Sequence, residues 1–362
     1  MKNKVFTLIL GLTAVLAFTA CSDDDSPTQP IEIIIEGAAI SPEVGGSNEP
    51  NQVYIDLSAN TTTTVKRDSW DLGFYSGSDF RVVINGSISM AAAQLEATDL
   101  NAVDSSTPEV LELQPRVIVG SFQAESATFV DNPEGNITGT AIAEVSSVAA
   151  NNHVYLLNLG FEVGSTTPAT GSVVINGTAR GWKKIKVLRN GNNYVLQYAD
   201  LDDTTYKEVT ISKDANYNFT FFSFGTEAKV NVEPEKSKWD LNFTYFTSVI
   251  PGNGAYGYAD FVVNNTKADA KVYMIDTTVE TSLTYDNFTL ANVTETNFSN
   301  DQRAIGSSWR NGGGPGTLPS LKDNVFYIVS DTDGNLYKLK FLALTNEAGE
   351  RGYPEFVYSL LK

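Results

Sequence analysis

The pattern Trp-Asp-Leu-x-Phe occurs twice, and it constrains the fold of this chain more than any other feature. One copy begins at Trp70 and the other at Trp239, in a sequence of 362 residues that contains four tryptophans. A second signature, Asn/Asp-Gly-Asn-x-Tyr-x-Leu, begins at Asn190 and again at Asp333. The signatures keep the same order, with 120 positions from Trp to turn in the first copy and 94 in the second. We therefore expect an internal duplication with insertions in the first copy.

The body of the chain has the composition of an all-β protein. Short alternating runs rich in Val, Ile, Thr, Tyr and Phe, such as residues 79–85 and 153–163, are separated by Gly, Asn and Asp. The pairs that begin at Asn190 and Asp333 can supply the positive φ angles of two-residue hairpin turns. Only residues 89–100 have plausible helical content. The sequence predicts an all-β fold of two tandem antiparallel β-rich units.

The N-terminus predicts export and lipid anchoring. Residues 1–20 have a positive start and a mostly apolar stretch, as in a secretory signal peptide. Cys21, the only cysteine, follows small residues and resembles the acylated Cys of a bacterial lipoprotein, although an incidental thiol is the alternative. We expect residues 21–50 to be an acidic, flexible tether from the lipidated Cys21. The first, diverged unit is expected over 51–213 and the second over 214–362.

Charge and motif content exclude several classes of function. The formal net charge is −18, which argues against nucleic acid and against peripheral binding to anionic lipid. The glycine-rich residues 311–316 lack the Gly-Lys-Ser/Thr that a P-loop requires. The single histidine, His153, supports neither a zinc cluster nor a Ser-His-Asp set. We therefore expect the protein not to be an enzyme.

The second copy carries a family resemblance. It contains "FFSF", "KVNV", "KWDLNF", "SSWRNGGGPG", "DGNLYKLKF" and a final strand in which Gly352, Phe356 and Tyr358 are spaced as GxxxFxY. This series is similar to HmuY, the haem-binding surface lipoproteins of Bacteroidetes, and the first copy matches more loosely. The resemblance implies haem capture at the outer membrane or cell surface, and transfer of haem to a TonB-dependent outer-membrane receptor.

The resemblance also implies where axial ligands to haem iron should lie. In the His-ligated members of the family, the first ligand follows the motif Trp by five residues. That position is Thr244 in the second copy, which cannot ligate iron, and Tyr75 in the first, which can. Met274 lies roughly where the second ligand of the family falls, and Met90 is a further candidate. Packing in the core is the alternative for both methionines.

Other residues are candidates for the lining of a haem pocket. Tyr245 follows the motif, and Tyr256 and Tyr258 lie in a glycine-rich stretch that we expect to be a loop. Their rings could contact a flat apolar ligand, or they could be ordinary loop aromatics. Arg310 could pair with a haem propionate; Arg81 and Lys238 are alternatives. No metal other than haem iron is expected.

The sequence leaves two further functions open. A structural or adhesion-type surface lipoprotein could retain the fold without the haem site. A protein of the same fold could also bind another small molecule or a glycan through its aromatic residues.

Overall fold

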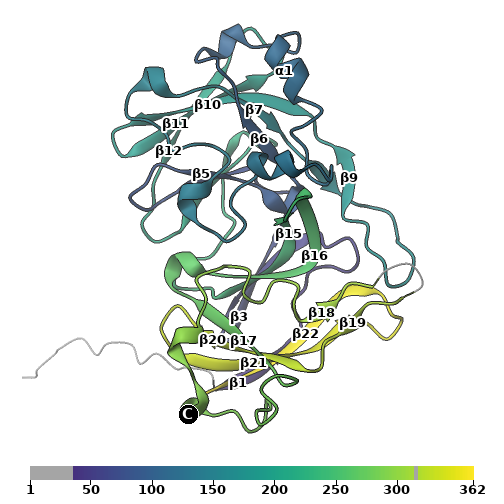
Figure 1. Ribbon diagram of the computed structural model, residues 1–362. Helices are drawn as coiled ribbons and strands as arrows, with labels where there is room; N and C mark the ends of the chain where they lie inside the picture. The colour runs from purple at the N-terminus through teal and green to yellow at the C-terminus, as the bar shows by residue number, and fades with distance from the viewer. Residues whose placement is uncertain (1–35, 314–316) are drawn as a thin grey trace, which may run out of the picture. The chain divides into compact units, whose positions relative to one another are not determined.

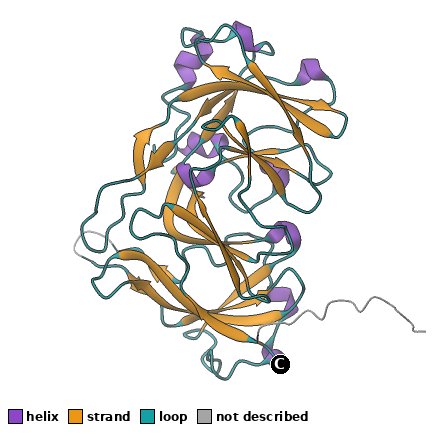
Figure 2. Ribbon diagram, turned by 180° about the vertical axis from the view of Figure 1, so that it is seen from behind, coloured by secondary structure: helices purple, strands orange, loops and turns teal. Residues whose placement is uncertain are grey.

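The computed structural model describes residues 36–313 and 317–362. The expected signal peptide, Cys21 and the first part of the expected tether lie outside the described residues. Strands make up most of the regular secondary structure of the described chain, which confirms the all-β prediction (Figure 2). Within it, no helix has the length and apolar character that a membrane crossing needs.

Each copy forms the main part of one five-stranded antiparallel sheet, and β1 from the segment before the first copy completes the second sheet. The first sheet has the order β12-β11-β10-β7-β6 and the second the order β1-β22-β21-β20-β17. The strands of the first sheet are β6 (Ala91–Gln94), β7 (Tyr155–Asn158), β10 (Trp182–Asn190), β11 (Asn193–Asp200) and β12 (Lys207–Ser212). Those of the second are β1 (Gly37–Ile40), β17 (Lys271–Asp276), β20 (Val325–Ser330), β21 (Leu336–Thr345) and β22 (Arg351–Leu360).

Two four-stranded sheets combine strands from both copies. One has the order β16-β15-β2-β3 and the other β14-β13-β4-β5. The strands of the first are β2 (Asn51–Asp56), β3 (Thr61–Lys66), β15 (Leu241–Ile250) and β16 (Gly254–Asn264). Those of the second are β4 (Leu72–Tyr75), β5 (Val82–Ile84), β13 (Phe219–Ser223) and β14 (Ala228–Val230). The hairpin that precedes each Trp-Asp motif therefore pairs with the motif strand of the other copy. The two copies exchange hairpins reciprocally.

The aspartate of each Trp-Asp motif fastens the exchanged hairpin. Asp71 donates its backbone N–H to Phe222 O at 2.9 Å, and Asp240 donates in the same way to Ile55 O at 2.7 Å. The buried carboxylate of Asp240 also accepts from Leu57 N at 2.8 Å. Buried backbone groups need such partners because water cannot reach them. The Trp-Asp motif thus occurs in both copies because in each copy it binds the hairpin of the other.

The exchange carries side chains into the opposite core. Phe222 is fully buried among first-copy residues such as Leu196, and Ile55 is fully buried among second-copy residues such as Leu339. Because core residues contribute most of the hydrophobic stabilisation, each copy depends on a hairpin that the other supplies.

Short elements complete the described fold. Two ribbons extend beside β16 (Figure 1): β8 (Phe161–Val163) with β9 (Asn176–Ala179), and β18 (Arg310–Asn311) with β19 (Ser320–Leu321). The α-helix is α1 (Pro108–Leu113). The 3-10 turns are η1 (Gly86–Ile88), η2 (Leu100–Ala102), η3 (Ala124–Phe129), η4 (Ile137–Gly139), η5 (Ala149–Asn151), η6 (Thr266–Ala268), η7 (Leu290–Asn292) and η8 (Glu295–Asn297).

The expected helical content of residues 89–100 is wrong, because this segment contains strand β6 and only the start of a 3-10 turn. Ala91 and Ala93 of β6 are small enough to let Val117 and Phe129 pack directly over the strand. Tertiary packing overrides the helix propensity of alanine here. Residues 37–40, which fall within the expected tether, form β1 and pair with β22.

Both expected hairpins form, but their turns differ. Asn190 pairs with Asn193, so the first hairpin has a two-residue turn that starts at Gly191, whose φ is +59°. In the second hairpin Ser330 pairs with Leu336, which leaves a five-residue loop between the strands. The carboxylate of Asp331 organises this loop by accepting from Asn335 N at 2.6 Å.

Candidate functional site

A large cleft lies beside β16, the edge strand of its sheet, and has a volume of about 1600 Å³. Residues of the β15–β16 hairpin, called the floor below, line the cleft together with residues of the β8–β9 ribbon of the first copy and of the β18–β19 ribbon of the second. Aromatic rings line it at five positions: Phe161, Tyr245, Tyr256, Tyr258 and Phe261. A volume above the roughly 300–1000 Å³ of drug-sized sites leaves room for a large flat ligand.

The floor of the cleft is a strand, whereas the sequence predicted a glycine-rich loop. Alternation along β16 places Tyr256 and Tyr258 on one face, with ring centroids 5.2 Å apart. Between them, Gly257 makes room for Tyr245, because a Cβ at Gly257 would lie 1.5 Å from the Tyr245 hydroxyl. The glycine therefore reflects a close approach of a ring to the strand rather than a flexible segment.

A β-bulge sets the position of Tyr245. The pairing of β15 with β16 shifts register between Thr244 and Phe246, where two residues of β16, Ala259 and Asp260, lie opposite Tyr245. Its hydroxyl lies 3.3 Å from Ser89 Oγ, and the guanidinium of buried Arg67 lies 5.5 Å from the centre of its ring. These contacts hold the ring in place beside the cleft.

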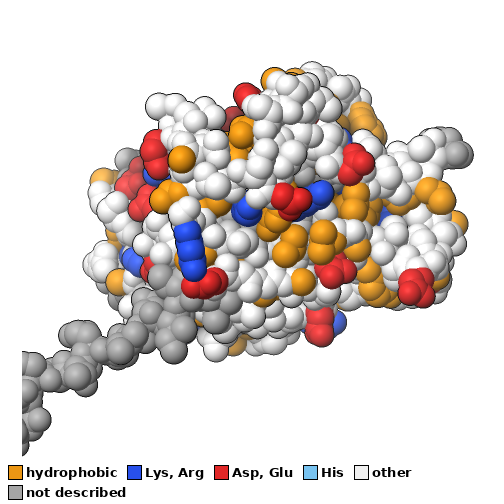
Figure 3. Space-filling model, turned by 90° about the horizontal axis from the view of Figure 1, so that it is seen from below, with side chains coloured by type: hydrophobic (Ala, Val, Ile, Leu, Met, Phe, Trp, Pro, Cys, Tyr) orange, Lys and Arg blue, Asp and Glu red, His pale blue; other side chains and the backbone are white. Residues whose placement is uncertain are grey.

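The cleft is rich in cations although the chain is acidic overall. Its described lining includes Arg303, Arg310, Lys322 and Arg351, with Asp301 as the acidic residue. Elsewhere charges are mixed: on the face in Figure 3, acidic, basic and hydrophobic side chains are interspersed. The positive lining favours a ligand that carries negative groups.

Two of these arginines are fixed by one buried carboxylate. Arg351 Nε donates to Asp260 Oδ2 at 2.9 Å, and Arg310 Nε lies 3.4 Å from the same oxygen. Asp260 in turn donates its backbone N–H to Glu49 Oε1 at 2.8 Å. Burial raises the pKa of the Glu49 carboxyl well above its usual range, and the neighbouring Asp260 adds to the rise. This shift favours the neutral form of the Glu49 carboxyl beside the two arginines.

The phenol of Tyr258 lies in a mixed electrostatic environment. Burial raises its pKa, and nearby Tyr256 raises it further. Arg303 and Arg310 act in the opposite direction by stabilising a phenolate. A metal ion that ligated this oxygen would displace its proton, and the arginines would favour the resulting charge.

The structure brings together the four residues predicted to line a pocket, Tyr245, Tyr256, Tyr258 and Arg310. The three candidate axial ligands lie elsewhere among the described residues. Met274 is 42% exposed on β17, so it is not a core residue. Tyr75 is half-buried at the end of β4, with its ring 5.7 Å from Phe219. Met90 is fully buried and lines a separate, smaller cavity, as Thr244 does.

Sequence reasoning missed several residues that line the cleft. Arg303, Lys322, Arg351 and Phe161 come from four separate segments, far from the Trp-Asp motifs in sequence. No local pattern marks them, because only the pairing of distant strands brings them to one place. In the part of the chain that the structure describes, no group of three or more His, Cys, Asp or Glu side chains could hold a metal ion.

Solved structures of related proteins resemble the chain only weakly. Apo PinO from Porphyromonas gingivitis is 15% identical, with 49% of this chain and 95% of that chain covered and a TM-score of 0.22. The apo HmuY analog of Tannerella forsythia is 11% identical, with 91% and 98% covered and a TM-score of 0.25. A protein from Bacteroides vulgatus described as HmuY-like and heme binding is 9% identical, with 90% and 91% covered and a TM-score of 0.22.

No curated protein matches the sequence significantly. The family model described as "HmuY protein" matches twice, over residues 48–211 and 215–358. The two matches cover most of the chain and agree with the two copies of the Trp-Asp motif. The chain belongs to the HmuY family, with two tandem copies of the family domain.

Proposed function

We propose that this protein binds haem, or a related tetrapyrrole, in the cleft beside β16 and does so without catalysis. The observation that carries the proposal is the composition of that cleft: five aromatic rings and four cationic side chains around about 1600 Å³. A tetrapyrrole has a flat apolar body that suits aromatic rings, and propionates that suit arginine and lysine. The smaller cavity, of about 190 Å³, falls below the roughly 300–1000 Å³ of drug-sized sites.

We infer that Tyr258 is the axial ligand to ferric iron. It shares the exposed face of β16 with Tyr256, and Arg303 and Arg310 favour its phenolate. Tyrosine is an established axial ligand of haem iron. Met274, Tyr75 and Met90, which family spacing and composition suggested, do not line the cleft, so they are the alternatives to be tested against Tyr258.

The wider role follows from the family and from the N-terminal sequence. We infer that Cys21 is acylated and anchors the protein at the outer membrane or cell surface, and that the bound haem passes to a TonB-dependent receptor. There are two alternatives: the cleft binds a different small molecule or a glycan, or the protein has a purely structural role. A haem titration distinguishes both of them from haem binding.

Titration of the purified mature protein with ferric haem, followed at the Soret band, tests the proposal. We expect a saturable shift, and Tyr258→Phe should weaken binding by at least about tenfold and remove the iron–phenolate signature. Tyr206→Phe, at an exposed tyrosine of the first copy, is the matched control and should bind as the wild type does.

Two results would count against the proposal in different ways. No saturable shift in either the ferric or the ferrous state would contradict haem binding altogether. A wild-type shift in Tyr258→Phe, together with loss of that shift in Met274→Ala or Tyr75→Phe, would contradict only the choice of ligand.

A further inference from the structure

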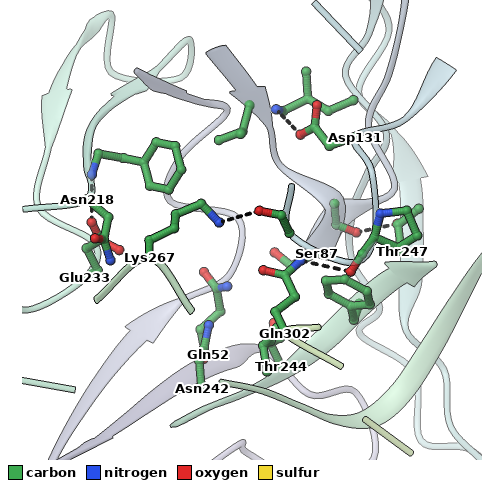
Figure 4. Close-up of a pocket in the computed structure, with 18 of the residues that line it drawn as sticks. Gln52, Ser87, Asp131, Asn218, Glu233, Asn242, Thr244, Thr247, Lys267 and Gln302 are labelled. Carbon is green, nitrogen blue, oxygen red and sulfur yellow. Dashed lines mark hydrogen bonds between the residues drawn. The ribbon is translucent and has the colours of Figure 1, made fainter. Parts of the chain in front are cut away.

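A second cavity, of about 190 Å³, lies where the two copies exchange their hairpins. Both motif tryptophans line it, together with side chains from strands β2 and β13 of the exchanged hairpins. Figure 4 shows Gln52 of β2 among the lining residues. Its aromatic and amide lining includes Gln52, Tyr54, Trp70, Phe219, Phe221 and Trp239. Thr244, where the resemblance would place the first haem ligand of the second copy, also lines this cavity but cannot ligate iron, and the proposed haem site beside β16 assigns the cavity no role.

The rings around this cavity form two equivalent pairs. Tyr54 meets Trp239 edge to face at 5.1 Å, and Phe221 meets Trp70 in the same way at 4.8 Å. They provide flat apolar surfaces in the cavity lining. An enclosed apolar cavity of about 150 Å³ is known to admit benzene. The volume here therefore suits a single aromatic ring with a small polar substituent.

The two aromatic pairs differ in the residue that faces the tryptophan N–H group. Trp70 Nε1 donates to Gln52 Oε1 at 2.9 Å. The position equivalent to Gln52 in the other hairpin is Phe219, whose side chain offers no acceptor. As a result, Nε1 of Trp239, a buried residue that is 8% exposed, has no hydrogen-bond partner. The cavity lining therefore lacks an acceptor for this N–H group, and a buried donor without a partner costs about 1–3 kcal/mol.

A lysine supplies positive charge inside the same cavity. Figure 4 shows Lys267 reaching across the pocket above Gln52 and Asn242. Its ammonium makes one long hydrogen bond, to Gly135 O at 3.4 Å, and forms no ion pair within 4.0 Å with any described residue. An ammonium group has three donors, so two remain for a ligand. Asn242 also makes no side-chain hydrogen bond, and its buried Oδ1 has no partner.

Of the two acids that line the cavity, Glu233 adds little negative charge at neutral pH, whereas Asp131 remains mostly ionised. Burial raises the pKa of Glu233 to about 8, so this carboxyl is mostly protonated at neutral pH. Asp131, whose pKa burial raises to about 6, already accepts from two backbone N–H groups at 2.8 Å, those of Ile84 and Ala141. The donors that remain for a ligand are the Trp239 N–H and the ammonium of Lys267, and the amide oxygens of Asn242 and Asn264 are acceptors without a partner.

We propose that this cavity binds a small aromatic carboxylate, with its ring against the aromatic lining that includes the motif tryptophans and its carboxylate on Lys267. The aromatic pairs set the shape of the ligand, and the ammonium and the Trp239 N–H set its charge. Because the walls come from both copies, bound ligand also stabilises the junction between them. The proposal does not depend on haem binding in the cleft beside β16.

Calorimetric titration with benzoate, benzamide and benzylamine tests the proposal on the full mature chain without haem. These probes share a ring of one size and differ in charge. We expect saturable binding of benzoate, at least about tenfold tighter than binding of benzamide, and no measurable binding of benzylamine. Benzoate should also raise the unfolding temperature of the protein.

Lys267→Met, which keeps most of the apolar stem, should weaken benzoate at least about tenfold. Lys229→Met, at an exposed lysine of β14, is the matched control and should leave benzoate affinity unchanged. The proposal is overturned if benzoate shows no saturable heat up to millimolar concentration, or if benzamide binds equally well. Because that comparison uses the wild type, it decides the matter even if Lys267→Met fails to fold.

Discussion

The reciprocal exchange of hairpins makes a specific prediction about Phe222. This residue belongs to the second copy in sequence, yet it is fully buried in the core of the first. Its ring lies 5.5 Å from Tyr198 of β11, a first-copy strand. Phe222→Ala should therefore lower the free energy of unfolding by about 3–5 kcal/mol, as large-to-small changes in a packed core do.

The magnitude alone does not locate the core that is damaged, so a double-mutant cycle is needed. We expect Phe222→Leu and Tyr198→Leu to be non-additive, with a coupling of about 0.5–1.5 kcal/mol, because their rings are in contact. Phe222→Leu and Phe243→Leu should be additive, since Phe243 lies in the core of the second copy and stacks on Phe356 at 5.5 Å.

Urea unfolding at equilibrium, with a common m-value across the variants, measures both cycles. Phe122→Ala, at a residue that is 58% exposed, serves as the control and should change stability by less than about 0.5 kcal/mol. Coupling of Phe222 to Phe243 together with additivity toward Tyr198 would refute the exchange.

Three further predictions concern individual groups. The folded protein keeps the proton of Glu233 up to about pH 8 whereas the unfolded chain releases it near 4.5, so stability falls as the pH rises between these values. Glu233→Gln should remove a fall of up to about 4 kcal/mol between pH 5 and 9 in urea titrations, and an unchanged pH profile would contradict this. Gly257→Ala should displace the Tyr245 ring and weaken haem binding at the Soret band, and wild-type affinity would argue against the described floor of the cleft. Asp260→Ala leaves Arg351 buried without its carboxylate and should cost about 3–5 kcal/mol in thermal or urea unfolding, whereas a neutral effect would mean that water reaches this cluster.

Local sequence patterns predicted the strands and the pairing within hairpins, but not the pairing of strands that are far apart in sequence. The turn at Gly191 and the alternation of its flanking strands depend on neighbouring residues, so the β10–β11 hairpin was predictable. The pairing of β2 with β15 joins residues far apart in sequence, and alternation is the same whichever motif strand the hairpin meets. The duplication was therefore visible in the sequence, whereas the exchange of hairpins was not.

The residues of the candidate site also divide into those that the local sequence indicated and those that it did not. Tyr256 and Tyr258 were predicted as pocket residues because two tyrosines beside glycines are conspicuous, although the segment is a strand and not a loop. Met274 was suggested by spacing alone, and spacing cannot tell which face of β17 is covered. Arg303 and Lys322 carry no local signal, since an arginine or lysine near an acidic residue is common on any surface.

Hydrogen exchange of the mature protein with and without ferric haem tests the central proposal most directly. We predict that haem slows exchange in peptides that contain β16 (Gly254–Asn264) and the β18–β19 ribbon, since both line the cleft. Peptides that contain β17 and Met274 should exchange at the same rate in both samples. Protection confined to β17 or to β4 with Tyr75, or no protection anywhere at saturating haem, would contradict the proposed site.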